Sequence, residues 1–187
     1  MKNLFAFSDE ELMLRIQKGD RKCFEYLYDR YQNKLFNFIF RFVGDRELAE
    51  DLMHDLFIKV IESTNQFDTN RKFSTWIYAL SINLCRNEIR KHSNRKQLIA
   101  ENLVIENFMS PDQQENIDKN NFKNEVNKYL ETLNEENKSL ILLRFHEDLS
   151  IPQISTIINL PEGTVKSRLF YLLKKIAVKL NAFHPSN

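Results

Sequence analysis

The amino-acid sequence predicts an all-α protein. Apolar residues recur three and four positions apart over most of the chain, which is the period of helices that bury one face. The 187 residues include only three glycines and four prolines, whereas sheets and phosphate-binding loops usually need more turn residues. Serine, aspartate or asparagine precedes several of the apolar stretches, at positions where such side chains cap helices. A hydrophobic content of 42% is enough for a packed core.

The first two helices have clear ends in the sequence. The segment from Ser8 to Glu11 resembles a capping box, in which a serine and a glutamate each satisfy a free backbone amide. A second helix is expected to contain residues 24–42 and to end at Gly44. Its many aromatic residues are more simply explained as core than as a cofactor site, because rings bury much apolar area.

Two further helices complete the predicted N-terminal domain, residues 1–98. Asp45 is expected to cap a helix at 46–63. A loop at 64–73 follows, and we expect Ser74 to cap a long helix that ends near residue 97. The predicted buried face of this long helix consists of Phe73, Trp76, Ile77, Leu80 and Leu84.

The rest of the chain predicts a linker and a second small helical domain. Residues 99–122 lose the helical period and are rich in asparagine, glutamine and acidic residues, which is typical of a flexible linker. In the C-terminal domain, residues 123–187, Ser150 and Gln153 form another capping box. A short helix, a turn at 159–161 and a helix at 162–181 follow, and this arrangement predicts a helix-turn-helix.

Charge is unevenly distributed, although the net charge is only +1. Residues 71–96 carry seven basic residues and one acid, a net +6, and residues 161–180 carry a net +4. The acidic linker between them has a net charge of −4. Such runs are either solvated helix faces or surfaces for nucleic acid, and charge alone leaves both interpretations open.

No enzyme motif is present. The chain lacks a phosphate loop, a dinucleotide fingerprint and a nucleophile elbow, and its histidines and cysteines lack metal-ligand spacing. Asp51 and Asp55 lie one helical turn apart, but they are better explained as an exposed acidic face than as a catalytic pair. We therefore expect no enzymatic activity, no metal and no cofactor.

The chain is also expected to be cytoplasmic. No apolar run approaches the roughly 18 residues of a membrane span, and the N-terminus does not read as a signal peptide. We expect no membrane insertion and two reduced cysteines, Cys23 and Cys85.

The last helix carries hydrogen-bond donors on one face. Val165, Leu169 and Leu172 are expected to point inward, which leaves a set of polar and aromatic side chains outside. Lysine, arginine, serine and threonine there can contact bases or phosphates in the major groove. The alternative is an ordinary amphipathic helix in a four-helix bundle.

Three segments resemble bacterial sigma factors of the extracytoplasmic-function (ECF) group. Residues 163–169, Gly-Thr-Val-Lys-Ser-Arg-Leu, with residues 149–154 before them, are similar to the promoter-recognition module. Residues 49–57, from Ala49-Glu50-Asp51-Leu52 to Phe57, resemble the helix that clamps onto RNA polymerase. Residues 73–78, with Asn83 and Arg90-Lys91, resemble the segment that opens promoter DNA.

The resemblance implies three sets of site residues. The polymerase-binding set, which would contact the clamp region of the largest subunit of core RNA polymerase, is Asp51, His54, Asp55 and Ile61. The set for the −10 element, with the loop at 65–72, is Arg71, Lys72, Trp76, Asn83, Asn87, Arg90 and Lys91. The set for the −35 element is Thr164, Lys166, Ser167, Arg168, Phe170 and Tyr171.

The resemblance also implies partners, with four departures from the family pattern. The partners are core polymerase, promoter DNA in duplex and single-stranded form, and an anti-sigma factor. The departures are His54 in place of glutamine, Asn87 in place of aspartate, Tyr171 in place of arginine, and Ser155 in place of alanine. The Ser155 departure costs little if the hydroxyl bonds backwards along the helix.

Two other functions are weighed against a sigma factor. The chain could be a one-component regulator in which residues 1–97 form a sensor or dimerisation domain, or a helical adaptor that binds only protein. A sensor has no need of Trp76, Asn83 and a basic segment together, which favours the sigma factor. Salt-dependent DNA binding would exclude the adaptor.

Overall fold

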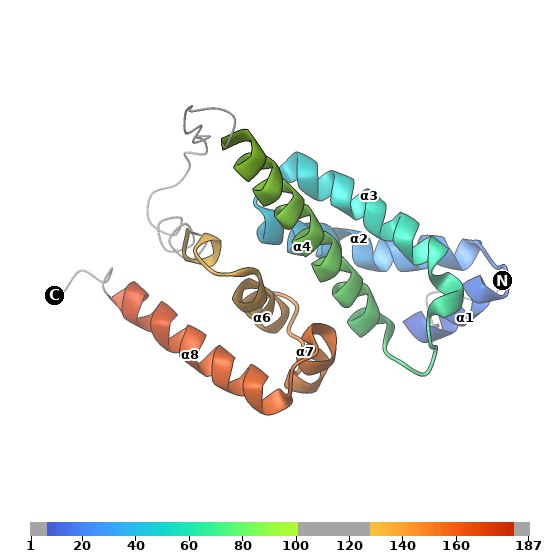
Figure 1. Cartoon of the computed structure of the whole chain (residues 1–187). Coiled ribbons are helices and arrows are strands. Elements are labelled where there is room, and N and C mark those ends of the chain that lie inside the picture. The colour runs from blue at the N-terminus through green and yellow to red at the C-terminus, as the bar shows by residue number, and fades with distance from the viewer. Residues whose placement is uncertain (1–6, 101–127, 182–187) are drawn as a thin grey trace, which may run out of the picture.

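The computed structural model describes residues 7–100 and 128–181, all without a β-strand (Figure 1). The side chains of residues 92–100 and 179–181 lie outside this description. The helices are α1 (Asp9–Gln17), α2 (Lys22–Val43), α3 (Arg46–Glu62), a 3-10 turn η2 (Thr64–Gln66), α4 (Phe73–Ala100), α6 (Glu135–Phe145), α7 (Ile151–Ile158) and α8 (Glu162–Asn181). The predicted linker lies almost wholly outside the described residues, so the three domain ranges stay predictions.

Most helix ends lie where local sequence signals place them. The Glu11 N–H donates to Ser8 Oγ over 3.2 Å, and the Ser8 N–H donates to Glu11 Oε2 over 2.7 Å. Gly44 ends α2 with a φ of 79°, and Asp45 accepts a hydrogen bond from the Leu48 N–H. The all-α prediction and these caps are therefore confirmed.

The predicted Ser74 cap is wrong, because α4 begins one residue earlier, at Phe73. The Phe73 N–H donates to Oε1 of Glu10 over 3.0 Å, so a carboxylate on α1 satisfies this helix end. The Phe73 side chain is fully buried, which places its backbone against α1. A cap that comes from 63 residues away has no local signature.

The N-terminal core forms around α2 and α4. Phe38 and Phe42 of α2 and Ile77 of α4 are fully buried, so the aromatic residues of α2 do belong mainly to the core. The buried face of α4 differs from the predicted one: Tyr78 and Cys85 are buried, whereas Trp76, Leu80 and Leu84 are only partly buried. This shift arises because α4 packs against α2 on one side and α7 on another, so one apolar stripe does not describe it.

The C-terminal helices form a three-helix unit that lies against the N-terminal half. Helices α6, α7 and α8 contact one another around buried residues such as Leu140, Ile154 and Val165. The same unit packs back onto the first half, with α7 against α4 and α6 against α2. Figure 1 shows α4 running between the two groups of helices.

Two glycines offer a matched test of backbone conformation. Gly44 has a positive φ and Gly163 does not, and a Cβ at either position meets no atom within 4 Å. We expect Gly44→Ala to lower the free energy of unfolding by about 1–2 kcal/mol, because a left-handed conformation is costly for alanine. Gly163→Ala should raise it by about 0.5–1 kcal/mol, because alanine favours helix. Urea denaturation followed by circular dichroism checks both, and equal stability of Gly44→Ala and wild type would contradict the strain.

Candidate nucleic-acid interface

The outer face of α8 presents the residues predicted to read the −35 element. Val165, Leu169 and Leu172 are buried, so the inward face is as predicted. The outward residues differ in exposure: Phe170 and Tyr171 are 63% and 62% exposed, and their rings meet edge to face. Lys166 and Ser167 are exposed as well, whereas Thr164 and Arg168 are partly buried. The exposed part of this set therefore combines Lys166 and Ser167 with the aromatic pair.

The turn before α8 is held by polar contacts within the helix-turn-helix. At the start of α7, the Ser150 N–H and hydroxyl both donate to Gln153 Oε1. At its end, Asn159 adopts a left-handed conformation with a φ of 54°. The Ser155 hydroxyl donates forward to the Leu160 carbonyl, so the hydroxyl is satisfied without a backward bond along the helix. The reason is that the left-handed residue folds the Leu160 carbonyl back over the end of α7.

Arg168 is held by a carboxylate from another helix. Its Nη1 lies 2.5 Å from Oε2 of Glu136, at the start of α6. Both side chains are partly exposed, so the pair is accessible to a competing anion. Glu136 carried no signal in the sequence, because the two residues lie 32 positions apart on different elements.

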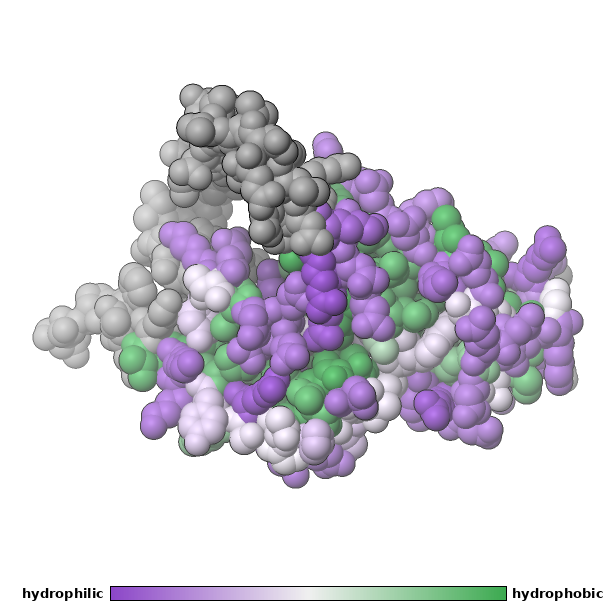
Figure 2. Space-filling view, viewed as in Figure 1, coloured by the Kyte–Doolittle hydropathy of each residue, from purple (hydrophilic) through white to green (hydrophobic). Residues whose placement is uncertain are grey.

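A second basic face follows α4. Asn83, Asn87, Arg90 and Lys91 are exposed, and Figure 2 shows a strongly hydrophilic band over this helix. Lys91 Nζ lies 2.9 Å from Oε2 of Glu88, one turn back on the same helix. Four of the seven residues predicted for the −10 element therefore share one helix face.

The other three lie around the loop that leads into α4. Arg71 and Lys72 are exposed, with carboxylates of Asp68 and Glu10 at 3.5 Å and 3.8 Å. Hydrogen bonds from Asn70 hold the pKa of Asp68 below its usual range, so this carboxylate stays charged. Trp76 is half-buried, with its ring 5.1 Å from that of Phe67 and 5.8 Å from that of Phe73. The loop thus joins two cations to an aromatic cluster.

A cavity of about 570 Å³ connects this loop with the helix-turn-helix. Its walls come from both halves of the chain, and they combine cations, an aromatic ring and amide or hydroxyl groups. The lining includes Arg71, Lys72, Trp76, Pro152, Gln153 and Thr156. The N-terminal end of α7 therefore lies over the loop end of the predicted −10 surface.

The predicted polymerase-binding residues lie on the outer face of α3. Asp51, His54 and Asp55 are exposed, and Ile61 is 56% exposed. Ile58 on the same helix is also exposed, at 42%. Two carboxylates and two exposed aliphatic side chains on this helix form an amphipathic surface.

In the described part of the chain, no helix combines the length and apolar character that a membrane span requires.

Comparisons with known proteins agree with this arrangement. The family model for sigma-70 region 2 matches residues 27–95, and the model for sigma-70 region 4 matches residues 123–176. The first match covers the helical domain with the basic face of α4, and the second covers the helix-turn-helix. The fold and these faces define a two-region protein of the sigma-70 class, which acts in transcription initiation.

Relatives of known identity narrow the class. The ECF RNA polymerase sigma factor SigW of Bacillus subtilis is 30% identical over 166 residues, which cover 83% of this chain and 87% of that protein. The ECF RNA polymerase sigma-E factor of Escherichia coli is 30% identical over 171 residues, or 87% and 89% of the two chains. The chain belongs to the extracytoplasmic-function group of RNA polymerase sigma factors. This membership disfavours the one-component regulator.

Solved structures share the fold over both halves. CnrH, in complex with the cytosolic domain of CnrY, matches with a TM-score of 0.71 and 19% identity, over 94% of this chain and 98% of that chain. RpoE of Bartonella quintana, in complex with the anti-sigma factor NepR, matches with a TM-score of 0.68 and 21% identity, over 87% and 99%. The two-domain helical fold is thus that of known sigma factors.

Proposed function

We propose that this sigma factor divides promoter recognition among three separate surfaces. The outer face of α3 binds core polymerase, the loop at 65–72 with the face of α4 binds the opened −10 element, and the outer face of α8 reads the −35 element. The observation that carries this proposal is that family regions 2 and 4 each contain an exposed basic helix face. The domains at 1–98 and 123–187, with the linker at 99–122, are part of the same proposal.

The α3 surface suits a protein partner. Asp51 and Asp55 can pair with basic residues on the clamp region of the largest subunit, while Ile61 supplies apolar contact area. His54 lies on the same exposed face and can donate or accept one hydrogen bond in its neutral form. Binding there leaves the basic faces of α4 and α8 available for DNA.

The −10 surface suits a displaced single strand. Arg71, Lys72, Arg90 and Lys91 can hold phosphates along the strand. Trp76 offers an aromatic edge beside the loop, and asparagine amides such as Asn83 can hydrogen-bond an unstacked base. Contacts made only with the opened strand favour opening, so the protein lends binding energy to melting without chemistry of its own.

The −35 surface suits duplex DNA. Lys166 and Arg168 can contact guanine or phosphate, and Ser167 can contact either, from the N-terminal part of a helix in the major groove. Thr164, Phe170 and Tyr171 flank these donors. Tyr171 offers a ring and a hydroxyl where many family members have a guanidinium, which changes the contact at that position.

The remaining parts of the proposal concern regulation and place of action. We propose that the protein is not an enzyme, that polymerase makes the RNA, and that it acts in the cytoplasm, where promoter DNA is found. The relatives CnrH and RpoE are solved with CnrY and with the anti-sigma factor NepR. By analogy, an anti-sigma factor would cover these surfaces until a signal arrives.

Run-off transcription with core polymerase tests the function, and a paired variant tests the clamp surface. Asp51→Ala with Asp55→Ala should weaken polymerase binding and leave DNA binding by the isolated chain unchanged, because the acids face the protein partner. The matched control is Glu25→Ala with Asp29→Ala, an exposed acidic pair with the same spacing on α2. Equal polymerase affinity of the two double variants would exclude this assignment, and no transcript with a compatible polymerase would exclude the function.

Arg168 is expected to contribute a base contact to the −35 element. Arg168→Ala should weaken binding to a −35 duplex by about 1–3 kcal/mol, whereas Lys175→Ala, further along α8, should cost less. Glu136→Gln should strengthen duplex binding, because it removes a carboxylate that competes with DNA for the guanidinium. Fluorescence anisotropy at fixed salt measures all three, and wild-type affinity in Arg168→Ala would remove Arg168 from the surface.

Trp76 is expected to act in strand opening rather than in initial binding. Trp76→Ala should reduce open complexes, measured by permanganate reactivity, more than closed-complex binding. Trp76→Phe keeps an aromatic ring against Phe67 and Phe73 and serves as the control for folding. If Trp76→Ala keeps its helical signal and weakens both steps equally, Trp76 has no special part in opening.

A further inference from the structure

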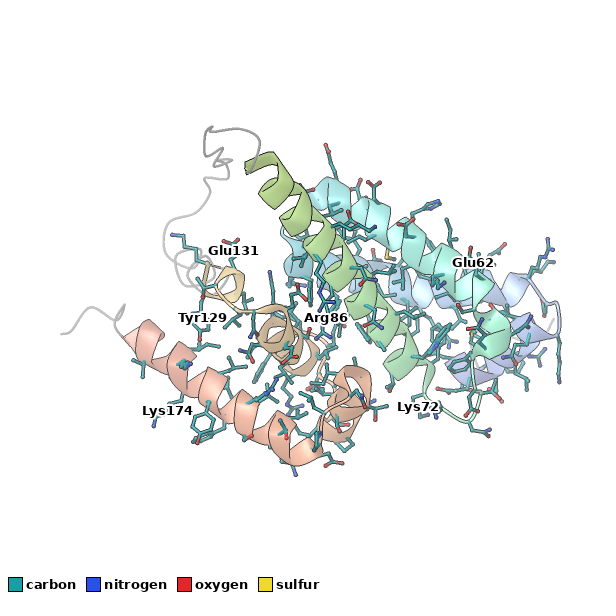
Figure 3. The ribbon with its side chains drawn as sticks, viewed as in Figure 1. Glu62, Lys72, Arg86, Tyr129, Glu131 and Lys174 are labelled. Carbon is teal, nitrogen blue, oxygen red and sulfur yellow. The ribbon has the colours of Figure 1, made fainter. Side chains whose placement is uncertain are left out.

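Arg86 lies on the basic segment of α4 but differs from its neighbours. Asn83, Asn87 and Arg90 are exposed, whereas Arg86 is partly buried and lies in the space between α4 and α6 (Figure 3). Its Nη2 reaches Ser139 Oγ at 3.4 Å, a long contact with a hydroxyl that already donates to the Glu135 carbonyl. The C-terminal domain therefore covers this arginine.

The covered guanidinium is poorly satisfied. Its Nε is buried and has no hydrogen-bond partner among the described residues, and no ion pair in that part of the chain joins Arg86 to a carboxylate. An arginine carries five N–H donors and stays charged, so burial without acceptors is costly. Contact with an anion outside the closed packing would satisfy this group better.

A second cation lies in the same interface. Lys138 of α6 is partly buried, with Nζ 5.9 Å from the centre of the Phe42 ring of α2. Burial lowers the pKa of Lys138 below its usual range. Closing α6 onto the first half thus brings two cations, Arg86 and Lys138, into partly buried positions, and their desolvation opposes closure.

One polar contact holds the closed arrangement from the other side. The Tyr78 hydroxyl on α4 donates to a carboxylate oxygen of Glu147, in the turn between α6 and α7. The Tyr78 ring is buried against that of Phe38, with centroids 5.3 Å apart, so its hydroxyl has a fixed direction. Burial is also the main reason why the pKa of Glu147 is above its usual range. This contact joins the two halves across 69 positions of sequence.

We propose that Arg86 is a phosphate-binding residue of the −10 surface, and that the chain's own C-terminal domain covers it in the free protein through the Tyr78–Glu147 contact. The ligand is single-stranded nucleic acid. The inference rests on the proposed function, because it assumes that the face of α4 binds the opened strand. Opening the two halves would free Arg86 and the cavity beside Trp76 together, since α6 covers one and α7 lines the other.

The closed arrangement lowers the apparent affinity for DNA. Only the open fraction of molecules can bind the strand along the whole of α4, so the apparent dissociation constant rises as that fraction falls. Removal of one hydrogen bond of ordinary net strength shifts such an equilibrium by about two- to tenfold. The same factor should appear as a gain in affinity, as long as the closed form predominates.

The test uses the full chain with Tyr78→Phe and, separately, Glu147→Ala. Tyr78→Phe removes only the hydroxyl and keeps the ring on Phe38, so it guards against a folding defect. Binding to a fluorescent single-stranded oligonucleotide with the −10 sequence found by run-off transcription is measured by anisotropy, and small-angle scattering gives the radius of gyration. Both variants should expand the chain and bind about two- to tenfold more tightly. Glu62→Ala, an exposed acid on α3, is the charge-matched control for Glu147→Ala and should behave as wild type.

A second arm tests Arg86 itself. In the Glu147→Ala background, Arg86→Gln should lower oligonucleotide affinity. The slope of log affinity against log salt concentration should also fall in magnitude by about one, the value for one phosphate contact. The matched control is Arg21→Gln, which changes an exposed arginine at the start of α2. It should lower oligonucleotide affinity less than Arg86→Gln does. Equal effects of the two substitutions would exclude Arg86 as a ligand.

The outcomes separate the inference from the proposed function. If Tyr78→Phe and Glu147→Ala both leave the radius of gyration and the oligonucleotide affinity unchanged, the covering role of the Tyr78–Glu147 contact is overturned. Expansion without tighter oligonucleotide binding, while wild type still supports run-off transcription, would overturn the masking and leave the function intact. If wild type with core polymerase yields no transcript, the proposed function fails, whatever the radius shows.

Discussion

The structure depends on the packing of α4 between two groups of helices. Its Phe73, Ile77 and Tyr78 side chains are buried, and its other faces meet α7 or carry the basic residues. In the proposed function, this helix is at once a core element, the end of the first domain and a nucleic-acid surface. Only part of the surface of α4 is therefore left for its polar residues. A small rotation of α4 would exchange buried and exposed side chains.

The basic residues of the two halves differ in how far they are buried. Arg90 and the loop cations lie in water, where their charges cost little to maintain. Arg86 and Lys138 lie partly inside an interface, where burial without acceptors opposes the closed form. Apolar packing of α7 on α4 and the Tyr78–Glu147 contact act in the other direction. The closed arrangement is thus a balance of opposing terms, and such a balance can be shifted by a partner.

The proposed −35 and polymerase-binding surfaces lie on helices whose inner faces are packed. The helix-turn-helix holds its turn through the left-handed Asn159 and the Ser155 hydroxyl, and α3 packs its inner face on α2. Specific contacts can then be made by exposed side chains without reordering the backbone at each surface. In the proposal, the two halves must move apart, because the C-terminal half covers Arg86 on the proposed DNA-binding face of α4.

The sequence by itself determined the local structure and the class of protein. Helix ends at Ser8, Gly44 and Asp45, and the inward face of α8, follow from neighbouring residues, so periodicity and cap residues were sufficient. Only the tertiary structure decided that Glu10 caps α4, that Glu136 holds Arg168, and that α6 covers Arg86. Each of these contacts joins residues more than 30 positions apart on different helices, and the spacing of residues within one helix holds no information about its neighbours.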